Sequence, residues 1–342
     1  MAKEKKVTFA DIAKYTGFSK TTVSRFFNDR DSLTLENQKK IQDALDVLGY
    51  QENKLAKVLA NGKSEFIGII IPNLYLNYYA EMLELLLSCY DQYGYKFLVF
   101  RANSKEEVER AYIRELQAYK IEGLIVLSHT IPSQELAAFQ IPTVAIEREA
   151  EDICSICVDN EEGGRMAAEH LIEDGCDDLI QVNTFFPQSS PAYGRITGFN
   201  QACHKKSRQP VLIQAEFSDT YESIQQKIAE IFEQIDEHYP KDHIKGVFLA
   251  NDTYASMFVK QILRKYKEFP DTYKVIGFDN TRAAQECAVG LTTIAQPMKE
   301  MADQAMELLN LQMEMKKKRI PETLDKPVHI KISPSLVARE TA

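Results

Sequence analysis

The sequence predicts a small all-α head of the helix-turn-helix type, a short hinge helix, and an α/β body of two doubly wound parallel-sheet lobes. Two observations predict this fold class. Helical patterns separated by turn residues fill residues 1–50. From Ser64 onward, strand-like apolar runs alternate with helical patterns, which is typical of parallel sheets covered by helices. The body holds about 280 residues, too many for one such lobe, so we expect two.

Three helices are expected in the head. The first begins at Thr8, which forms a capping-box pattern with Asp11, and ends near Gly17. The second and third helices begin at the polar caps Ser19 and Thr34. Apolar residues at helical spacing form their inner faces, namely Ile12, Ala13, Val23, Phe26, Phe27, Ile41, Ala44, Leu45 and Leu48.

The head pattern indicates a DNA-binding helix-turn-helix, although a small helical bundle with purely structural caps would share it. In a helix-turn-helix, the second helix enters the major groove. Lys20 and Thr21 stand at the N-terminal end of that helix, where base edges are reached. The further candidate contacts to phosphates or bases are Thr8, Ser19, Thr22, Ser24, Arg25 and Asn28.

The segment after the head has helical composition over only about two turns, from residue 53 to 60. An isolated helix of this length is marginal in water. We therefore expect this hinge helix to need a partner in order to stay folded.

Strand-like runs in the body end in polar and aromatic residues. The strands are expected at 66–71, 96–100, 123–127, 143–146, 179–182, 211–214, 246–250 and 275–278, and the main helices at 80–93, 105–119, 164–173, 194–205, 221–238 and 253–266. Ligands of parallel sheets bind beyond the carboxyl ends of the strands. This rule selects Arg101, Asn103, Ser128 and Asn280, together with the residues that we take as candidate effector contacts: Asn73, Tyr75, Glu147, Arg148, Asn251, Asp252 and Asp279. Charged groups can bind vicinal hydroxyls and aromatic faces can cover C–H surfaces, so we expect a polyhydroxylated ligand.

Composition and charge fit this organisation. Hydrophobic residues make up 44% of the 342 residues, enough for a large core, and no run of about 18 apolar residues predicts a membrane span. No apolar run follows the basic segment 1–6, so we expect no secretory signal and a cytoplasmic location. The net charge is −9, but residues 1–62 carry 11 Lys and Arg against 8 Asp and Glu. A basic head on an acidic body confines attraction for phosphate groups to the head.

The six cysteines suggest neither a disulfide framework nor a metal site. They are scattered along the chain, which fits reduced thiols. Cys154 and Cys157 have the C-x-x-C spacing of metal and redox sites, but they lie in an apolar run without a second Cys or His pair. We therefore expect no metal and no cofactor.

Several short motifs form a specific pattern in and after the head: VTFADIA at 7–13, GFS at 17–19, TVSRFFN at 22–28, and LGY at 48–50 followed by NKLA at 53–56. This pattern resembles the lac/gal repressor family of bacterial transcription regulators. The family usually has a smaller aliphatic pair where this chain has Phe26 and Phe27. The resemblance implies that two hinge helices pair across a dimer in the minor groove, with Leu59 wedged between base pairs. It makes Asn53, Lys54, Ala56 and Leu59 candidate DNA contacts.

The resemblance extends over the whole chain and implies a periplasmic-binding-protein-like body. It adds Tyr78, Tyr79, Arg195 and Phe217 to the candidate effector contacts and supports Glu147, Arg148, Asn251, Asp252 and Asp279. It also implies a crossover between lobes at 291–297 and a terminal strand at 336–340. Simpler roles stay open: Tyr78 and Tyr79 as helix core, Asp252 as a helix cap, Arg195 as an ion-pair partner and Asp279 as a turn former.

These patterns predict a head at 1–52, a hinge helix and linker at 53–63, and a body at 64–342. The first lobe is expected at about 64–163 and 295–327, and the second at about 164–294 and 328–342.

We interpret the chain as a sequence-specific repressor of a carbohydrate-utilisation operon, bound to near-palindromic operator DNA. A small sugar or sugar-phosphate effector between the lobes would release it. The hinge needs a mate, so we expect a homodimer; the lack of apolar heptads after Glu340 disfavours a C-terminal coil that builds tetramers. No Gly-rich phosphate loop, G-x-S-x-G or H-E-x-x-H motif occurs, so we expect no catalytic residues and no enzyme.

Two other interpretations share the fold. A catabolite-control regulator would bind a phosphorylated carrier protein and would have a basic residue on the helix after the crossover, where this chain has Glu307. A transport-linked sugar-binding protein would have the two-lobed body with a signal peptide and without the head.

Overall fold

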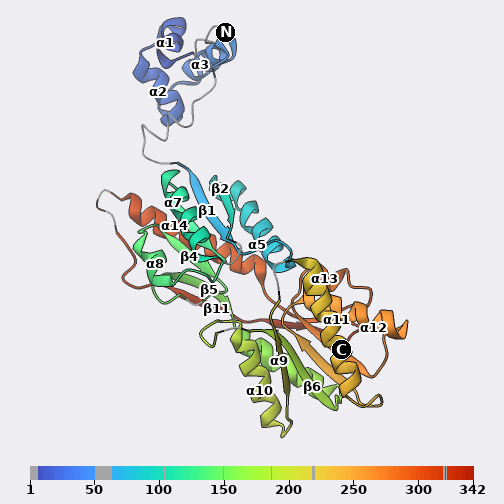
Figure 1. Cartoon of the computed structure of the whole chain (residues 1–342). Helices are drawn as coiled ribbons and strands as arrows, with labels where there is room; N and C mark the ends of the chain where they lie inside the picture. The colour runs from blue at the N-terminus through green and yellow to red at the C-terminus, as the bar shows by residue number, and fades with distance from the viewer. Residues whose placement is uncertain are drawn as a thin grey trace. The chain divides into compact units, whose positions relative to one another are not determined.

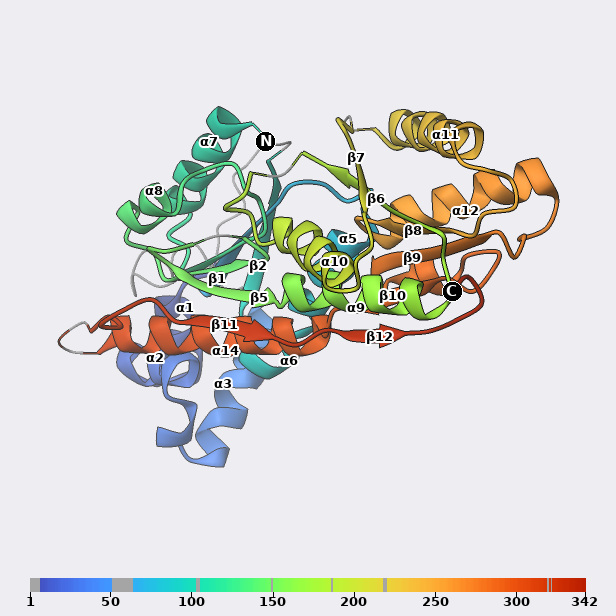
Figure 2. The same cartoon turned by 90° about the horizontal axis from the view of Figure 1, so that it is seen from below.

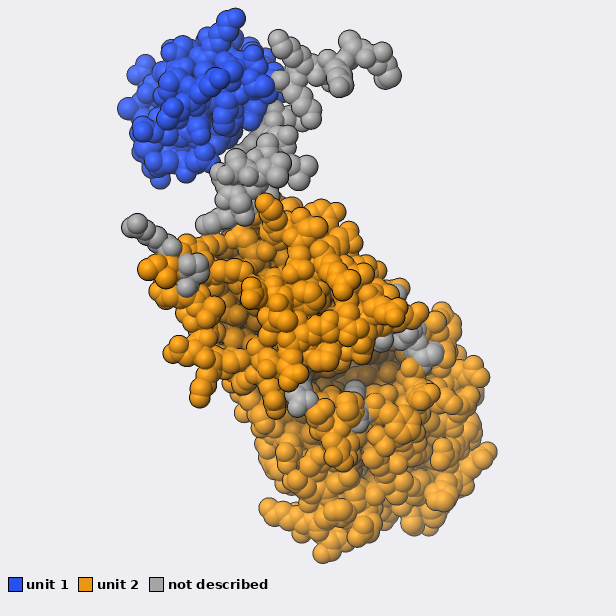
Figure 3. Space-filling model, turned by 60° about the vertical axis from the view of Figure 1, so that its left-hand side comes forward, with its two compact units in different colours: residues 1–63 blue, residues 64–342 orange. Residues whose placement is uncertain are grey.

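The structure is a computed structural model that describes residues 7–50, 64–102, 105–148, 150–185, 187–217, 220–318, 320 and 322–342. It divides into two units, Met1–Lys63 and Ser64–Ala342 (Figure 3). The expected hinge helix, with the candidate DNA contacts Asn53, Lys54, Ala56 and Leu59, lies outside the described residues. Its fold and its contacts therefore stay predictions.

The first unit contains the three expected helices (Figure 1): α1 (Phe9–Thr16), α2 (Lys20–Asn28) and α3 (Leu35–Leu48), with a 3-10 turn η1 (Arg30–Ser32) between the last two. The backbone N–H of Thr8 donates to the Asp11 carboxylate at 2.9 Å, which caps α1. Gly17 ends α1 with a φ of 75°, a left-handed conformation that glycine adopts without strain. The hydroxyls of Ser19 and Thr34 accept backbone N–H groups at the starts of α2 and α3.

The paired phenylalanines of α2 belong to an aromatic cluster. Phe26 is buried in the head core, and the guanidinium of Arg30 lies 4.5 Å from its ring centroid. Phe27 stacks on Phe9 with 5.0 Å between centroids and lies 5.7 Å from the ring of Tyr50. The larger pair therefore fills the space between α1 and the end of α3, and the three-helix arrangement is kept.

The first lobe of the body is built on a parallel sheet with the strand order β11-β5-β4-β3-β1-β2. Its strands are β1 (Phe66–Ile71), β2 (Lys96–Arg101), β3 (Gly123–Val126), β4 (Thr143–Ile146), β5 (Cys154–Val158) and β11 (His329–Ile332). Its helices are α5 (Asn77–Ser88), α6 (Tyr90–Tyr93), α7 (Glu106–Ala118), α8 (Ser133–Ala138) and α14 (Met298–Lys317).

The second lobe is built on a sheet with the order β12-β10-β9-β8-β6-β7, parallel except for β12. Its strands are β6 (Asp178–Thr184), β7 (Val211–Ala215), β8 (Lys245–Leu249), β9 (Tyr273–Asp279), β10 (Thr292–Ala295) and β12 (Ser335–Val337). Its helices are α9 (Asn160–Glu173), α10 (Tyr193–Lys205), α11 (Tyr221–His238), α12 (Asp252–Tyr266) and α13 (Arg282–Gln285). The two doubly wound lobes are confirmed.

Three strands differ from the sequence prediction. Neither β5 nor β11 is expected from the sequence, and the segment predicted only as a crossover contains the strand β10. Residues 328–342 are expected in the second lobe, but β11 pairs with β5 in the first sheet, with Ile330 opposite Ile156. The chain enters the second sheet only at β12 (Figure 2). β11 is a short edge strand whose side chains are exposed or half-buried, so it has no strong apolar signal.

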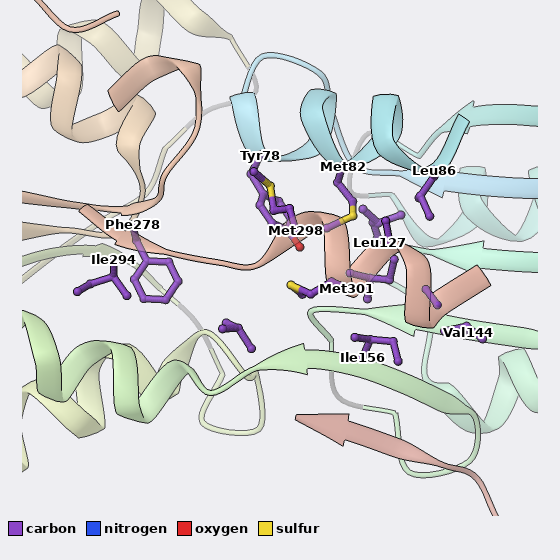
Figure 4. Close-up of a cluster of buried hydrophobic side chains, with 14 of the residues drawn as sticks. Tyr78, Met82, Leu86, Leu127, Val144, Ile156, Phe278, Ile294, Met298 and Met301 are labelled. Carbon is purple, nitrogen blue, oxygen red and sulfur yellow. The ribbon is translucent and has the colours of Figure 1, made fainter. Parts of the chain in front are cut away.

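A hydrophobic cluster continues from one lobe into the other (Figure 4). Leu127 and Ile156 belong to it from the first lobe, and Phe278 and Ile294 from the second. Met301, in the first turn of α14 after the crossover, joins the same cluster. The segments that connect the lobes therefore run through a shared core.

Within the described ranges, no helix has both the length and the apolar character needed to cross a bilayer. The same residues contain no group of three His, Cys, Asp or Glu side chains placed to hold a metal ion. All six cysteines are free thiols.

A buried carboxylate joins three elements of the second lobe. The Asp236 side chain on α11 accepts a hydrogen bond from the hydroxyl of Tyr273 at 2.9 Å and another from Tyr266. The ammonium groups of Lys241 and Lys265 lie 2.6 and 2.9 Å from it. Burial by itself raises the pKa of Asp236, but these hydrogen bonds outweigh burial and hold the pKa below its usual range.

We predict that Asp236→Ala lowers the free energy of unfolding by about 3 kcal/mol, because it leaves the Tyr273 hydroxyl buried without its acceptor and two cations without their partner. Urea denaturation at pH 7 measures this loss. A group with a depressed pKa stabilises the fold above its unfolded pKa, so the difference from wild type should shrink below about pH 4. Glu233→Ala is the matched control, because Glu233 is an exposed partner of Lys265 and should contribute less than about 1 kcal/mol. Equal losses in the two variants would contradict the assigned role of Asp236.

Candidate functional site

The candidate DNA contacts of the first unit lie on and beside α2. Lys20 and Thr21 are exposed at its N-terminal end, and Arg25 is exposed one turn later. Ser19 caps the helix, and its hydroxyl lies 2.9 Å from that of Thr22. The remaining candidates, Thr8, Ser24 and Asn28, form hydrogen bonds with near neighbours in their own helices. Lys20, Thr21 and Arg25 thus present charged and polar groups on one exposed helix, as a major-groove reader requires.

The body has a pocket of about 140 Å³ between its two lobes, which we call the inner pocket. Its lining consists of Leu76, Tyr78, Tyr79, His129, Glu147, Thr184, Ala192, Arg195, Ala250, Asn251, Tyr254, Asp279 and Gln296. Glu147, Ala250 and Asp279 lie at the carboxyl ends of β4, β8 and β9. Ligands of parallel sheets bind at this edge.

Arg195, on the first turn of α10, is the only arginine or lysine among the described lining residues of the inner pocket. Its Nε donates to the Asn160 side chain at 2.7 Å, and its Nη1 donates to the carbonyl of Ala250 at 2.5 Å. The guanidinium lies 3.6 Å from the centroid of the Phe278 ring. Its Nη2 faces the carboxylates of Glu147 and Asp279 at 3.7 and 4.0 Å. These contacts fix the cation and leave it close to two acids.

Two glycines place Arg195 by letting α9 and α10 approach closely. A Cβ atom on Gly198 would lie 1.9 Å from the carbonyl oxygen of Glu161, and one on Gly164 would lie 2.2 Å from that of Arg195. No larger residue fits either position without separating the helices. The close approach brings Asn160, at the start of α9, to the guanidinium of Arg195.

The two carboxylates of the inner pocket are buried and held by neighbouring donors. Glu147 accepts from the backbone N–H of Val158 at 2.5 Å and from the Asn160 amide at 3.0 Å. Asp279 accepts from the Gln296 amide at 2.7 Å. Burial raises the pKa of both carboxyl groups, while Arg195 opposes the rise.

Two polar atoms of the lining have no hydrogen-bond partner among the described residues. They are the hydroxyl of Tyr78 and the Oε1 atom of Gln296, both buried. An unpartnered buried polar atom is costly, and at a binding site a ligand can satisfy it. The inner pocket therefore offers a free hydroxyl and a free carbonyl oxygen beside a cation and two carboxylates.

Six of the eleven candidate effector residues line the inner pocket: Tyr78, Tyr79, Glu147, Arg195, Asn251 and Asp279. Asn251 also caps α12, because its side chain accepts the backbone N–H of Tyr254 at 2.9 Å. Asn251, rather than Asp252, is therefore the residue that caps α12.

The other five candidates do not line the inner pocket. Asn73 accepts the backbone N–H of Leu76, and Tyr75 packs against the hydrophobic cluster of the second lobe. Phe217 stacks on the lining residue Tyr254 with 4.4 Å between centroids. The remaining two, Asp252 and Arg148, point away from the pocket into hydrogen-bonded sites.

Asp252 is fully buried and accepts the backbone N–H of Thr281 at 2.7 Å and the hydroxyl of Thr293 at 2.5 Å. It joins α12 to β10 and to the start of α13. Arg148 donates to the carbonyls of Ser128 and Ile131 in the loop after β3. These structural contacts hold both side chains, and their roles as effector contacts stay predictions.

Sequence reasoning missed seven lining residues: Leu76, His129, Thr184, Ala192, Ala250, Tyr254 and Gln296. His129, Thr184, Ala250 and Gln296 follow or end strands, so the rule of strand ends could have found them. Gln296 was hidden because the strand β10 before it is not recognised in the sequence. Leu76, Ala192 and Tyr254 come from loops or helices and have no local signal.

Two family models match the chain. The one described as bacterial regulatory proteins, lacI family, matches residues 8–53, and the one described as periplasmic binding protein-like domain matches residues 168–342. The chain is also 31% identical to the sucrose operon repressor of Streptococcus mutans over 301 residues, which cover 87% of this chain and 90% of that protein. The chain belongs to the lacI family of bacterial regulatory proteins.

Other members of the lacI family are similar over nearly the whole chain. The ribose operon repressor of Halalkalibacterium halodurans is 28% identical over 337 residues, which cover 98% of this chain and 96% of that protein. Among solved structures, the lac repressor dimer bound to operator and the anti-inducer ONPF has a TM-score of 0.80 at 23% identity. This match covers 98% of this chain and 99% of the lac repressor chain, and it confirms the fold.

We predict that Tyr78→Phe leaves the free energy of unfolding unchanged or raises it by about 1 kcal/mol, because it removes a buried hydroxyl without a partner. Tyr273→Phe is the control and should lower it by about 1–2 kcal/mol, because that hydroxyl donates to Asp236. Urea denaturation of both variants measures the difference. A loss in Tyr78→Phe as large as that in Tyr273→Phe would show that the Tyr78 hydroxyl is satisfied in the free protein.

Proposed function

We propose that this lacI-family protein represses a carbohydrate-utilisation operon and leaves its operator when a small neutral sugar binds in the inner pocket. The observation that carries the proposal is the inner pocket itself. It combines a fixed guanidinium, two carboxylates and two unpartnered polar atoms with the aromatic rings of Tyr78, Tyr79 and Tyr254. Such a set can bind several hydroxyl groups and cover the apolar face of a sugar ring.

The charge of the inner pocket favours a neutral sugar over a sugar phosphate. The carboxyl groups of Glu147 and Asp279 face the single guanidinium of Arg195, and their burial already disfavours further negative charge. The protein atoms around the cleft and the nearby guanidiniums of Arg148 and Arg195 lower the pKa of His129, although its side chain still reaches solvent, so the neutral imidazole predominates at pH 7. A phosphate dianion would thus meet two acids and one base, whereas hydroxyl groups can donate to the acids and accept from the guanidinium.

A second copy of the chain is part of the proposed function. β2 is an edge strand of the first sheet, and α5 lies beside it (Figure 1). Val99 on β2, Leu87 on α5 and Tyr90 on α6 are apolar and exposed. Exposed apolar edges are typical of interfaces, and a two-fold dimer would present two heads to a near-palindromic operator. Operator binding also requires a location in the bacterial cytoplasm.

Release would follow from the position of the inner pocket between two lobes. A ligand that contacts both lobes binds one lobe arrangement more tightly than others, and this difference is what shifts a conformational equilibrium. In the proposed sequence of events, the shift separates the two hinge helices that the sequence predicts at 53–60, each of which would be marginal alone.

Catabolite control through a phosphorylated carrier protein is the second candidate. The catabolite control protein A of Priestia megaterium is among the relatives, at 24% identity. On α14, the exposed residues Glu300 and Glu307 face solvent near Asp303. Glu307 lies where this second function would need a basic residue, and its carboxylate repels a phosphorylated partner, so the sugar-responsive function is favoured.

We predict that Arg25→Ala lowers operator affinity about tenfold and reduces the slope of log K against log salt by about one, because a phosphate or base contact is lost. Fluorescence anisotropy on sites selected from random DNA measures both quantities. Lys260→Ala, an exposed position on α12, is the control and should leave the slope unchanged. An unchanged slope in Arg25→Ala would remove Arg25 from the interface.

We predict that at least one neutral sugar raises the melting temperature and releases operator DNA, while its phosphorylated form does neither. A ligand at 100 times its Kd stabilises the native state by about 2.7 kcal/mol. Glu147→Gln keeps the size of the side chain and should weaken binding at least tenfold, since a charged hydrogen-bond acceptor is lost. Release by the sugar phosphate alone would overturn the preference for a neutral ligand.

A further inference from the structure

A second cavity lies beside the inner pocket, and we call it the outer pocket. Its volume is about 600 Å³. The first lobe contributes His129, Gln134, Arg148 and Asp152, and the second lobe contributes Phe185 and Ser190. His129 lines both pockets, so the two cavities meet at this side chain.

The inner pocket is small for a complete effector. Its 140 Å³ lies below the range of about 300–1,000 Å³ that is usual for ligand pockets. It therefore suits a single sugar ring. A ligand with a second unit can reach the outer pocket past His129 and contact both lobes there too.

Polar and charged side chains, some of them held in place by hydrogen bonds, line part of the outer pocket. Arg148 is 4% exposed and its guanidinium is pinned by the carbonyls of Ser128 and Ile131. Its Nε atom has no hydrogen-bond partner among the described residues. The Ser133 hydroxyl donates to Asp152 at 2.7 Å. Beside this fixed cation, the carboxylate of Asp152, the amide of Gln134 and the serine hydroxyls of the lining provide partners for further hydroxyl groups.

The outer pocket also carries an exposed aromatic ring. Phe185 directly follows β6 and is 59% exposed. The packing of the fold does not depend on this ring, because most of its surface is open to water. The face of an aromatic ring is electron-rich and can cover the C–H face of a sugar ring.

We propose that the effector is a glycoside of at least two sugar units, with one ring in the inner pocket and the next in the outer pocket against Phe185. This inference rests on the proposed function, because it assumes that the inner pocket binds a sugar. Arg148 then belongs to the binding site of the second unit, which explains why it lies outside the inner pocket.

Isothermal titration calorimetry of the full chain tests this inference. The probes are sucrose, maltose, cellobiose and lactose, together with glucose, fructose and galactose. The variants are Phe185→Ala, Phe185→Trp and the control Tyr221→Ala, which removes an exposed ring at the start of α11 that lines neither pocket.

We expect one disaccharide to bind at least tenfold more tightly than either of its units. The Phe185→Ala variant should bind that disaccharide about three- to tenfold more weakly than wild type, whereas the affinities of Phe185→Trp and Tyr221→Ala should equal that of wild type. Equal affinity for a disaccharide and one of its units, or an unchanged disaccharide affinity in Phe185→Ala, would overturn the two-unit inference and leave the proposed function intact. If no sugar binds while operator binding persists, the sugar-responsive function itself is wrong.

Discussion

The guanidinium of Arg195 is nearly closed off from water. The groups that must surround this buried cation determine the geometry of the interlobe site. A buried cation is costly unless hydrogen bonds and opposite charges surround it. The Asn160 side chain, the carbonyl of Ala250 and the ring of Phe278 hold it on one side. Glu147 faces it from the first lobe, so the charge balance of the site depends on how the two lobes are placed.

The space between the Arg195 guanidinium and the two carboxylates is where a ligand would bind. Glu147 and Asp279 lie 3.7 and 4.0 Å from the guanidinium, beyond hydrogen-bond distance. A hydroxyl group that donates to a carboxylate and accepts from Arg195 would give both side chains a hydrogen-bond partner at once. The unpartnered hydroxyl of Tyr78 adds a further donor. This arrangement supports the proposed preference for a polyol over an anion.

The same region also carries the mechanical link between the lobes. The cluster around Leu127, Phe278 and Met301 runs through the crossover segments. Packed cores resist continuous deformation and tend to have discrete arrangements. In the proposed function, a ligand in the neighbouring cleft would act on this packed junction. The head has a separate core of Ile12, Val23 and Ile41, so its fold does not depend on that junction.

Rules that use only neighbouring residues were enough to predict the helices of the head and much of the body from the sequence. Caps at Thr8, Ser19 and Thr34, and the alternation of apolar runs with helical patterns, are properties of neighbouring residues. The rule of strand ends located Glu147 and Asp279 for the same reason. What it could not decide was which of two adjacent polar residues faces the ligand. Glu147 has a left-handed φ of 52° and enters the inner pocket, while Arg148 turns into the loop after β3.

Only the tertiary structure decided the sheet to which β11 belongs, the contact between α9 and α10 at Gly164 and Gly198, and the place of Phe185 beside the cleft. Each of these depends on partners far away in the chain. Hydrophobic periodicity records which face of an element is buried, but not the element against which it packs. The sequence alone was therefore enough to predict the kind of protein and the sheet edge where the candidate site lies, whereas the packing of distant segments sets the shape and charge of that site.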